Sequence, residues 1–167
     1  AYILVPVLRE GRTWALSENR EAKIPAIYPD YRASLPEVVG MVEEAVKNYP
    51  IEANKVYVMG CSEGGVGVFG AVRQYPRVFA GAVAISGAWD IAEAGKMTGV
   101  PLTVLHGVND AIYPVSETRK LVETIRNKFG RVEYAEFPRL GHDCSAGSLY
   151  RQEEVWEWLF FQERRFN

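Results

Sequence analysis

The residues best suited to chemistry form a short run at positions 60–64, Gly-Cys-Ser-Glu-Gly. The run follows a predicted strand at Lys55–Gly60 and precedes a predicted helix at Val66–Tyr75, the setting that a Gly-x-Ser-x-Gly nucleophile elbow requires. Such a turn lifts the Ser62 hydroxyl clear of the sheet and needs small residues on both sides. The helix directs its positive end at the site, so the backbone N–H of Glu63 is a candidate oxyanion donor. Because the chain has 15 glycines, a glycine-rich turn capped by a serine is the competing interpretation.

A serine hydroxyl needs a general base near neutral pH, and the sequence offers two histidines. His106 ends a predicted strand, four residues before Asp110. His142 lies in a glycine-containing loop after the last predicted strand, and it follows the best-placed carboxylate in the order nucleophile, acid, base that accompanies this elbow motif. We therefore predict that His142 is the base and that His106 is structural.

The acid partner should lie on a loop at the carboxyl end of a strand, where it can orient the imidazole. Asp110 fits this position best. Asp90 follows the preceding strand and is the second candidate, whereas Asp143 adjoins His142 too closely in sequence to orient it easily. Either of the first two aspartates could instead be a turn former or a helix cap.

The elements that must position these residues alternate between strands and helices, which predicts an α/β fold with a parallel sheet. The predicted strands are Tyr2–Val7, Lys55–Gly60, Ala80–Ser86, Leu102–His106 and Val132–Phe137. The predicted helices are Leu35–Tyr49, Val66–Tyr75, Val115–Phe129 and Gln152–Gln162. Before the first helix, Ser34 and Glu37 are spaced as a capping box.

Length and charge narrow the function. With 167 residues, 48% of them hydrophobic, we expect a single domain over residues 1–167. A net charge of −2 without a basic block gives no basis for binding nucleic acid or an anionic membrane. No apolar run approaches the roughly 20 residues that span a bilayer, so we expect a soluble protein. The start at Ala1 has no initiator Met and no signal-peptide pattern, which leaves the localisation undetermined.

Together these segments resemble the α/β-hydrolase superfamily, and within it the phospholipase/carboxylesterase-like esterases that include "predicted peptidases". The likeness runs through the whole chain. It is carried by the elbow, by residues 101–107 with Asp110 and Pro114, by residues 141–143 and by the ending 158–162. The resemblance implies a three-layer sandwich with a mainly parallel sheet. It also implies hydrolysis of short-chain acyl or aryl esters through an acyl-enzyme, without a metal or organic cofactor.

The chain departs from this family on its N-terminal side. Such enzymes normally begin with three further strands, and a His-Gly-containing loop after the third supplies the second oxyanion donor. In the usual order that third strand would separate Tyr2–Val7 from Lys55–Gly60. An unpaired buried strand edge is costly and prone to association. We therefore expect upstream residues, or a second polypeptide, to complete the sheet.

Two cysteines flank the predicted triad, Cys61 next to the nucleophile and Cys144 two residues beyond the base. If the triad assembles, their sulfurs should come near each other. The arrangement is similar to the disulfide-bridged Cys-Ser and His-Cys pairs of tannase-type feruloyl esterases, with the second cysteine displaced by one residue. The sequence leaves a disulfide and two buried thiols as alternatives.

The predicted reaction begins when His142 takes the proton of Ser62 as the oxygen attacks an ester carbonyl. Asp110 stabilises the imidazolium, and the N–H of Glu63 holds the oxyanion. Two other functions are possible, a serine peptidase with the same triad and a catalytically silent ligand-binding module.

Two aromatic residues are candidates for lining the substrate pocket. Trp89 and Tyr113 lie next to the strand ends that carry the possible acids. Packing in the core or at the rim is the alternative for each of them.

Overall fold

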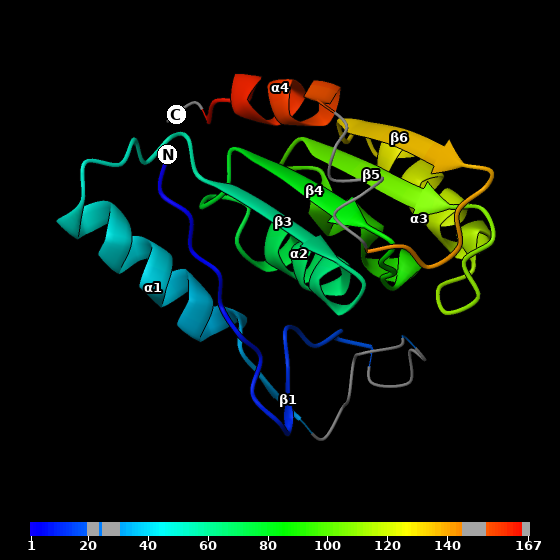
Figure 1. The fold of residues 1–167 in the computed structure, drawn as a ribbon, viewed down its shortest axis with the longest axis horizontal. Helices are drawn as coiled ribbons and strands as arrows, with labels where there is room; N and C mark the ends of the chain where they lie inside the picture. The colour runs from blue at the N-terminus through cyan, green and yellow to red at the C-terminus, as the bar shows by residue number, and fades with distance from the viewer. Residues whose placement is uncertain (20–23, 25–30, 145–152, 165–167) are drawn as a thin grey trace.

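The computed structural model describes residues 1–19, 24, 31–144 and 153–164. Its centre is a four-stranded, fully parallel sheet with the strand order β3-β4-β5-β6 (Figure 1). The strands are β3 (Tyr57–Cys61), β4 (Gly81–Ile85), β5 (Leu102–Gly107) and β6 (Val132–Phe137). These four elements were predicted, and the α/β class is confirmed.

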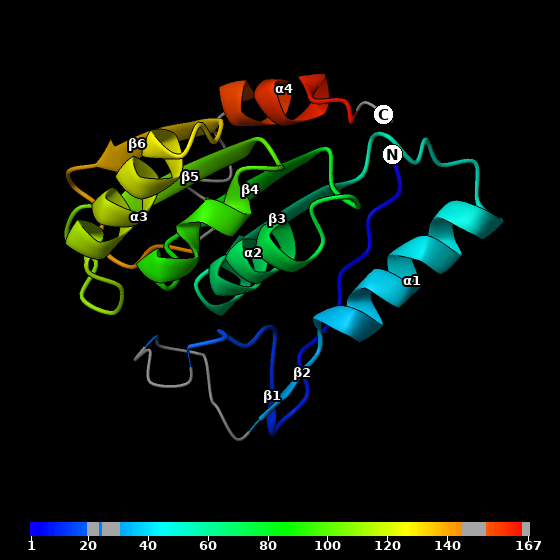
Figure 2. The ribbon, with the colours of Figure 1, turned by 180° about the vertical axis from the view of Figure 1, so that it is seen from behind.

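Helices cover both faces of the sheet. On one face lie α2 (Glu63–Gln74), α3 (Val115–Asn127) and the 3-10 helix η1 (Ile91–Met97), and on the other lies α4 (Glu153–Phe161) (Figures 1 and 2). The helix α1 (Leu35–Asn48) lies beyond the β3 edge (Figure 2). None of the described helices is long and apolar enough to cross a membrane.

The core is divided by the alternation of side chains along the buried strands. On β4, Ala82 and Ala84 join the large cluster on the α2 side, whereas Val83 and Ile85 join a smaller cluster around Leu159 of α4. All five β4 residues are buried. Packing on both faces therefore holds β4 in place, and its carboxyl end at Ile85 pairs with the end of β3 at Cys61.

The segment Tyr2–Val7 is not a strand, contrary to our prediction. It runs as an extended chain beside α1, with Ile3, Val5 and Val7 all at least 75% exposed (Figure 1). The Tyr2 ring lies 5.5 Å from the ring of Tyr49, at the end of α1. Strand propensity is not sufficient without a neighbouring strand to share hydrogen bonds.

The outer edge of β3 has no paired strand among the described residues. The remaining strands, β1 (Arg12–Thr13) and β2 (Arg32–Ala33), pair only with each other, in parallel. The chain as described therefore presents an open edge to the side on which α1 lies.

The predicted capping box at the start of α1 is also wrong. The Ser34 side chain makes no capping bond and instead accepts a hydrogen bond from Arg12 Nε at 3.1 Å. Glu37, the other half of the box, pairs with the same guanidinium at 2.6 Å. The N–H of Leu35 donates to the carbonyl of Trp14 at 3.0 Å, so a distant segment satisfies the helix start.

Candidate active site

Ser62 occupies the turn between β3 and α2 in a strained backbone conformation, with φ 57° and ψ −121°. Its N–H donates to the carbonyl of Ile85 at the end of β4 (2.9 Å), and its carbonyl accepts from the N–H of Val66 (3.0 Å). The strand thus passes directly into the helix, which begins at Glu63, three residues before the predicted start. The N–H of this first helical residue has no acceptor within the helix and is available to an oxyanion.

The two glycines of the elbow are not equivalent. A Cβ atom at Gly60 would lie 2.3 Å from the carbonyl oxygen of Gly64, a backbone clash. A Cβ atom at Gly64 would meet nothing within 4 Å. The turn therefore requires a glycine before Ser62, whereas the expected need for a small residue after it is not evident in the described structure.

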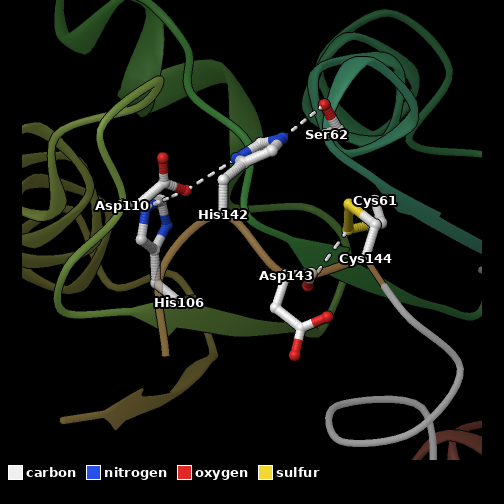
Figure 3. Close-up of a disulfide and its surroundings, with 7 residues drawn as sticks. All are labelled: Cys61, Ser62, His106, Asp110, His142, Asp143 and Cys144. Carbon is white, nitrogen blue, oxygen red and sulfur yellow. Dashed lines mark hydrogen bonds and ion pairs between the residues drawn. A yellow bond between two sulfur atoms is a disulfide. The ribbon is translucent and has the colours of Figure 1, made fainter. Parts of the chain in front are cut away.

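The three predicted side chains lie in one hydrogen-bonded line (Figure 3). His142 Nε2 is 2.7 Å from Ser62 Oγ, and His142 Nδ1 is 2.9 Å from Asp110 Oδ2. A carboxylate only accepts, so Nδ1 carries the proton and Nε2 can accept the hydroxyl proton of the serine. This is the arrangement in which an imidazole can act as a general base toward a serine.

Asp110 is fixed by donors to both of its oxygens. Oδ1 accepts from the N–H groups of Ile112 and Tyr113, each at 2.8 Å, while Oδ2 faces His142. The carboxylate has no exposed surface. Its orientation is therefore set by the backbone turn that follows β5.

His142 is placed by close packing of two loops. A Cβ atom at Gly107, at the end of β5, would lie 2.1 Å from the carbonyl oxygen of Gly141. The N–H of Asn109 donates to the carbonyl of Leu140 at 2.9 Å, and its side-chain amide donates to the carbonyl of Pro138 at 2.9 Å. The loop that carries Asp110 and the loop that carries His142 are therefore held against each other.

Cys61 and Cys144 form a disulfide, with their Cα atoms 5.7 Å apart. The bond joins the residue before Ser62 to the second residue after His142 (Figure 3). It closes a sequence separation of 83 residues. Of the two alternatives left by the sequence, the structure has the bridge, which links the nucleophile turn to the base loop.

Two further sequence candidates, Asp90 and Trp89, make their hydrogen bonds with residues of η1. Asp90 is the N-cap of η1, with its Oδ1 accepting from the N–H of Ala92 at 2.9 Å, as the capping alternative predicted. Trp89 is only 4% exposed, and its Nε1 donates to Glu93 at 2.6 Å. Trp89 thus packs in the core, which was the alternative to a pocket-lining position.

Tyr113 is buried but lies next to the site, since its ring centre is 5.5 Å from that of His142. Sequence reasoning missed the role of its backbone, whose N–H donates to Asp110 and whose carbonyl lies 2.8 Å from His106 Nε2. The sequence signal for this was the short spacing of His106, Asp110 and Tyr113, which places the last two in the turn that directly follows the strand carrying His106.

Partial burial raises the pKa of the Glu63 side chain, which follows the nucleophile. A carboxylate at this position adds negative charge close to the elbow. The described part of the chain contains no group of three or more His, Cys, Asp or Glu side chains arranged to hold a metal ion.

Comparisons with known proteins identify a family for this chain. Residues 13–154 match the Phospholipase/Carboxylesterase family. A stretch of 66 residues is 35% identical to feruloyl esterase B of Neurospora crassa, covering 40% of this chain and 23% of that protein.

Among solved structures, a thermostable esterase superposes with a TM-score of 0.74 at 26% identity, over 92% of this chain and 42% of its own. An acylaminoacyl peptidase of Pyrococcus horikoshii shares the fold, with a TM-score of 0.70 at 14% identity over 81% of this chain and 29% of its own. This chain thus spans less than half the length of these relatives. The family match extends over most of the chain, and its range contains Ser62, Asp110 and His142. The chain therefore belongs to the phospholipase/carboxylesterase family of α/β-hydrolases.

Proposed function

We propose that this chain carries the catalytic site of a serine esterase, which hydrolyses carboxylic esters through an acyl-enzyme on Ser62. The observation that carries the proposal is the line of Ser62, His142 and Asp110, with contacts of 2.7 Å and 2.9 Å. The strained elbow, which aims the serine at the base, supports it further.

In the proposed reaction, His142 Nε2 accepts the hydroxyl proton as Ser62 Oγ forms a bond to the ester carbonyl carbon. The carbonyl electrons move to the oxygen, which the N–H of Glu63 stabilises. Asp110 stays ionised and stabilises the imidazolium. When the tetrahedral intermediate collapses, the bond to the alcohol oxygen breaks and that oxygen takes the proton from His142. Water then repeats the sequence and releases the acid.

The substrate class follows from the family and from its feruloyl esterase relative. We infer that the substrates are short-chain acyl or aryl esters. We also propose that residues 1–167 form a single domain. The carboxylate of Glu63 beside the elbow disfavours substrates that carry a negative charge close to the scissile bond.

The test compares an ester with its amide counterpart, p-nitrophenyl butyrate and the p-nitroanilide of butyric acid. We expect turnover of the ester, and Ser62→Ala should lower kcat on the order of a millionfold. The matched control is Ser116→Ala, because Ser116 is an exposed serine on α3. Faster turnover of the amide would favour a peptidase. Binding of the ester by a folded chain without any turnover would favour a ligand-binding module.

A further inference from the structure

We propose that the second histidine, His106, is a positioning residue for Asp110, so that the site is a line of four side chains rather than three. This inference rests on the proposed esterase function. His106 lies on β5 and is completely buried, directly behind the acid (Figure 3). Its Nε2 lies 2.8 Å from the carbonyl oxygen of Tyr113 and 3.3 Å from Asp110 Oδ2.

The surroundings of His106 determine which nitrogen carries its proton. A carbonyl and a carboxylate can only accept hydrogen bonds, so Nε2 must be protonated to face both of them. Nδ1 lies 3.2 Å from the hydroxyl oxygen of Thr118 on α3, a hydroxyl that also lies 3.4 Å from the carbonyl oxygen of Gly87. An imidazole with its proton on Nε2 presents a donor to both acceptors and leaves Nδ1 to accept from the Thr118 hydroxyl, at the shorter of that hydroxyl's two contacts.

His106 acts on Asp110 by two routes. Directly, its Nε2–H places a positive dipole beside Oδ2, the oxygen that also receives His142 Nδ1. Indirectly, it holds the carbonyl of Tyr113, whose own N–H donates to Oδ1 at 2.8 Å. His106 therefore helps to orient both oxygens of Asp110, Oδ2 by direct contact and Oδ1 through Tyr113.

This arrangement matters because Asp110 can orient His142 only from one rotamer. Removing the Nε2–H of His106 takes a donor away from the buried Tyr113 carbonyl. The turn that carries the Oδ1 donors then loses a contact that holds it in position. A displacement of 1 Å at a catalytic group is enough to lower a rate about 100-fold. A purely structural histidine would instead affect folding and leave the His142–Asp110 bond as it is.

Two conservative variants separate the two nitrogens. His106→Gln has an amide nitrogen at about the reach of Nε2 and retains a donor toward Tyr113 and Asp110. His106→Asn reaches only to the level of Nδ1, so it retains a polar group near Thr118 but loses that donor. Ile125→Val, a buried change further along α3, is the control for lost stability alone.

The readouts are kcat and KM for an ester, and the low-field proton NMR signal of His142 Nδ1–H. We expect His106→Asn to lower kcat about 10- to 100-fold with little change in KM, and to shift or broaden the signal. His106→Gln should recover both, and Ile125→Val should change neither. Equal kcat and an unmoved signal in folded His106→Asn would overturn the proposal, as would equal losses in the two His106 variants. If the unmodified chain turns over no ester, the esterase proposal fails, while the NMR comparison still tests the role of His106.

Discussion

At the scale of single residues, the site depends on a backbone conformation that serine adopts only at a cost. Ser62 has a positive φ, and the crowding between Gly60 and Gly64 leaves no space for a side chain at the first of these positions. Two backbone hydrogen bonds, from the Ser62 N–H to Ile85 and from the Val66 N–H to the Ser62 carbonyl, hold this conformation against relaxation. The strain is thus located at the residue that we propose as the nucleophile.

The pH dependence of stability should report the burial of Glu63. Burial raises its pKa above the ordinary value of 4.5, so ionisation costs more in the folded than in the unfolded chain. The carboxylate therefore destabilises the fold as the pH rises through and above that value, and it has no such effect at lower pH. Because water still reaches part of the side chain, we expect Glu63→Gln to raise the Tm by only about 1–2 °C at pH 7.

Thermal unfolding of the original protein and of Glu63→Gln at pH 3.5 and pH 7 checks this expectation. The two curves should coincide at the lower pH and separate at the higher one. A Tm difference of the same size at both pH values would show that the effect is not due to ionisation.

The motif and the order of residues were sufficient to select the three side chains that the structure brings together. They could not decide whether Trp89 lines a pocket or packs in the core, because its hydrogen bond to Glu93 of η1 forms only in the folded structure. They predicted a structural role for His106 but not its partners, because the contacts to Tyr113 and Thr118 depend on how β5 packs against α3.

At the scale of elements, the hydrophobic pattern predicted β3 to β6, of which β4 and β5 are buried throughout and β3 and β6 form the two edges of the parallel sheet. The same pattern failed at Tyr2–Val7, which has strand propensity but no strand beside it. The capping-box spacing failed at Ser34, whose side chain accepts a hydrogen bond from Arg12, a residue 22 positions away. Both outcomes depend on which distant parts of the chain lie side by side, which a local pattern does not contain.

The disulfide connects two of these elements and should contribute to their stability. By closing a separation of 83 residues, the Cys61–Cys144 bond restricts the unfolded chain. We expect the double variant Cys61→Ala, Cys144→Ala to lose about 2–4 kcal/mol of unfolding free energy. Urea unfolding measures this loss.

The same bond can be checked chemically. Thiol titration of the unreduced protein under denaturing conditions should find no free thiol, and titration after reduction should find two, since both cysteines are in the bridge. Free thiols before reduction, or unchanged urea unfolding of the double variant, would contradict this account of the loop.

At the scale of the whole molecule, the open edge of β3 is the unfinished part of the fold. We propose that a further strand, from a longer form of this chain or from a second chain, pairs with it. The Val56 carbonyl and the Ser62 N–H point toward β4, so alternation directs the N–H groups of Tyr57, Met59 and Cys61 to the open side. The N-terminal segment, in which Ile3 and Val5 are exposed, runs on the same side of the molecule (Figure 1).

Hydrogen exchange of the 167-residue chain at high dilution tests this edge. The amides of Tyr57, Met59 and Cys61 should exchange much faster than those of Val58 and Gly60. Protection of all five should appear only when a pairing chain is present. Uniform protection in a dilute monomer would mean that the chain covers its own edge, and the proposed extra strand would be unnecessary.

The most direct test of the central claim is labelling of the chain with a fluorophosphonate, followed by intact mass and peptide mapping. We predict one adduct, on Ser62, and none in Ser62→Ala. Asp110→Asn should slow labelling about 10⁴-fold, because its amide can present an N–H to His142 Nδ1 and favour the wrong tautomer. Asp90→Asn is the matched control, since asparagine caps a helix as well as aspartate does, and its labelling should be unchanged. No adduct on the folded chain, or equal labelling of Asp110→Asn and the unmodified protein, would contradict the proposal that Asp110 and His142 activate Ser62.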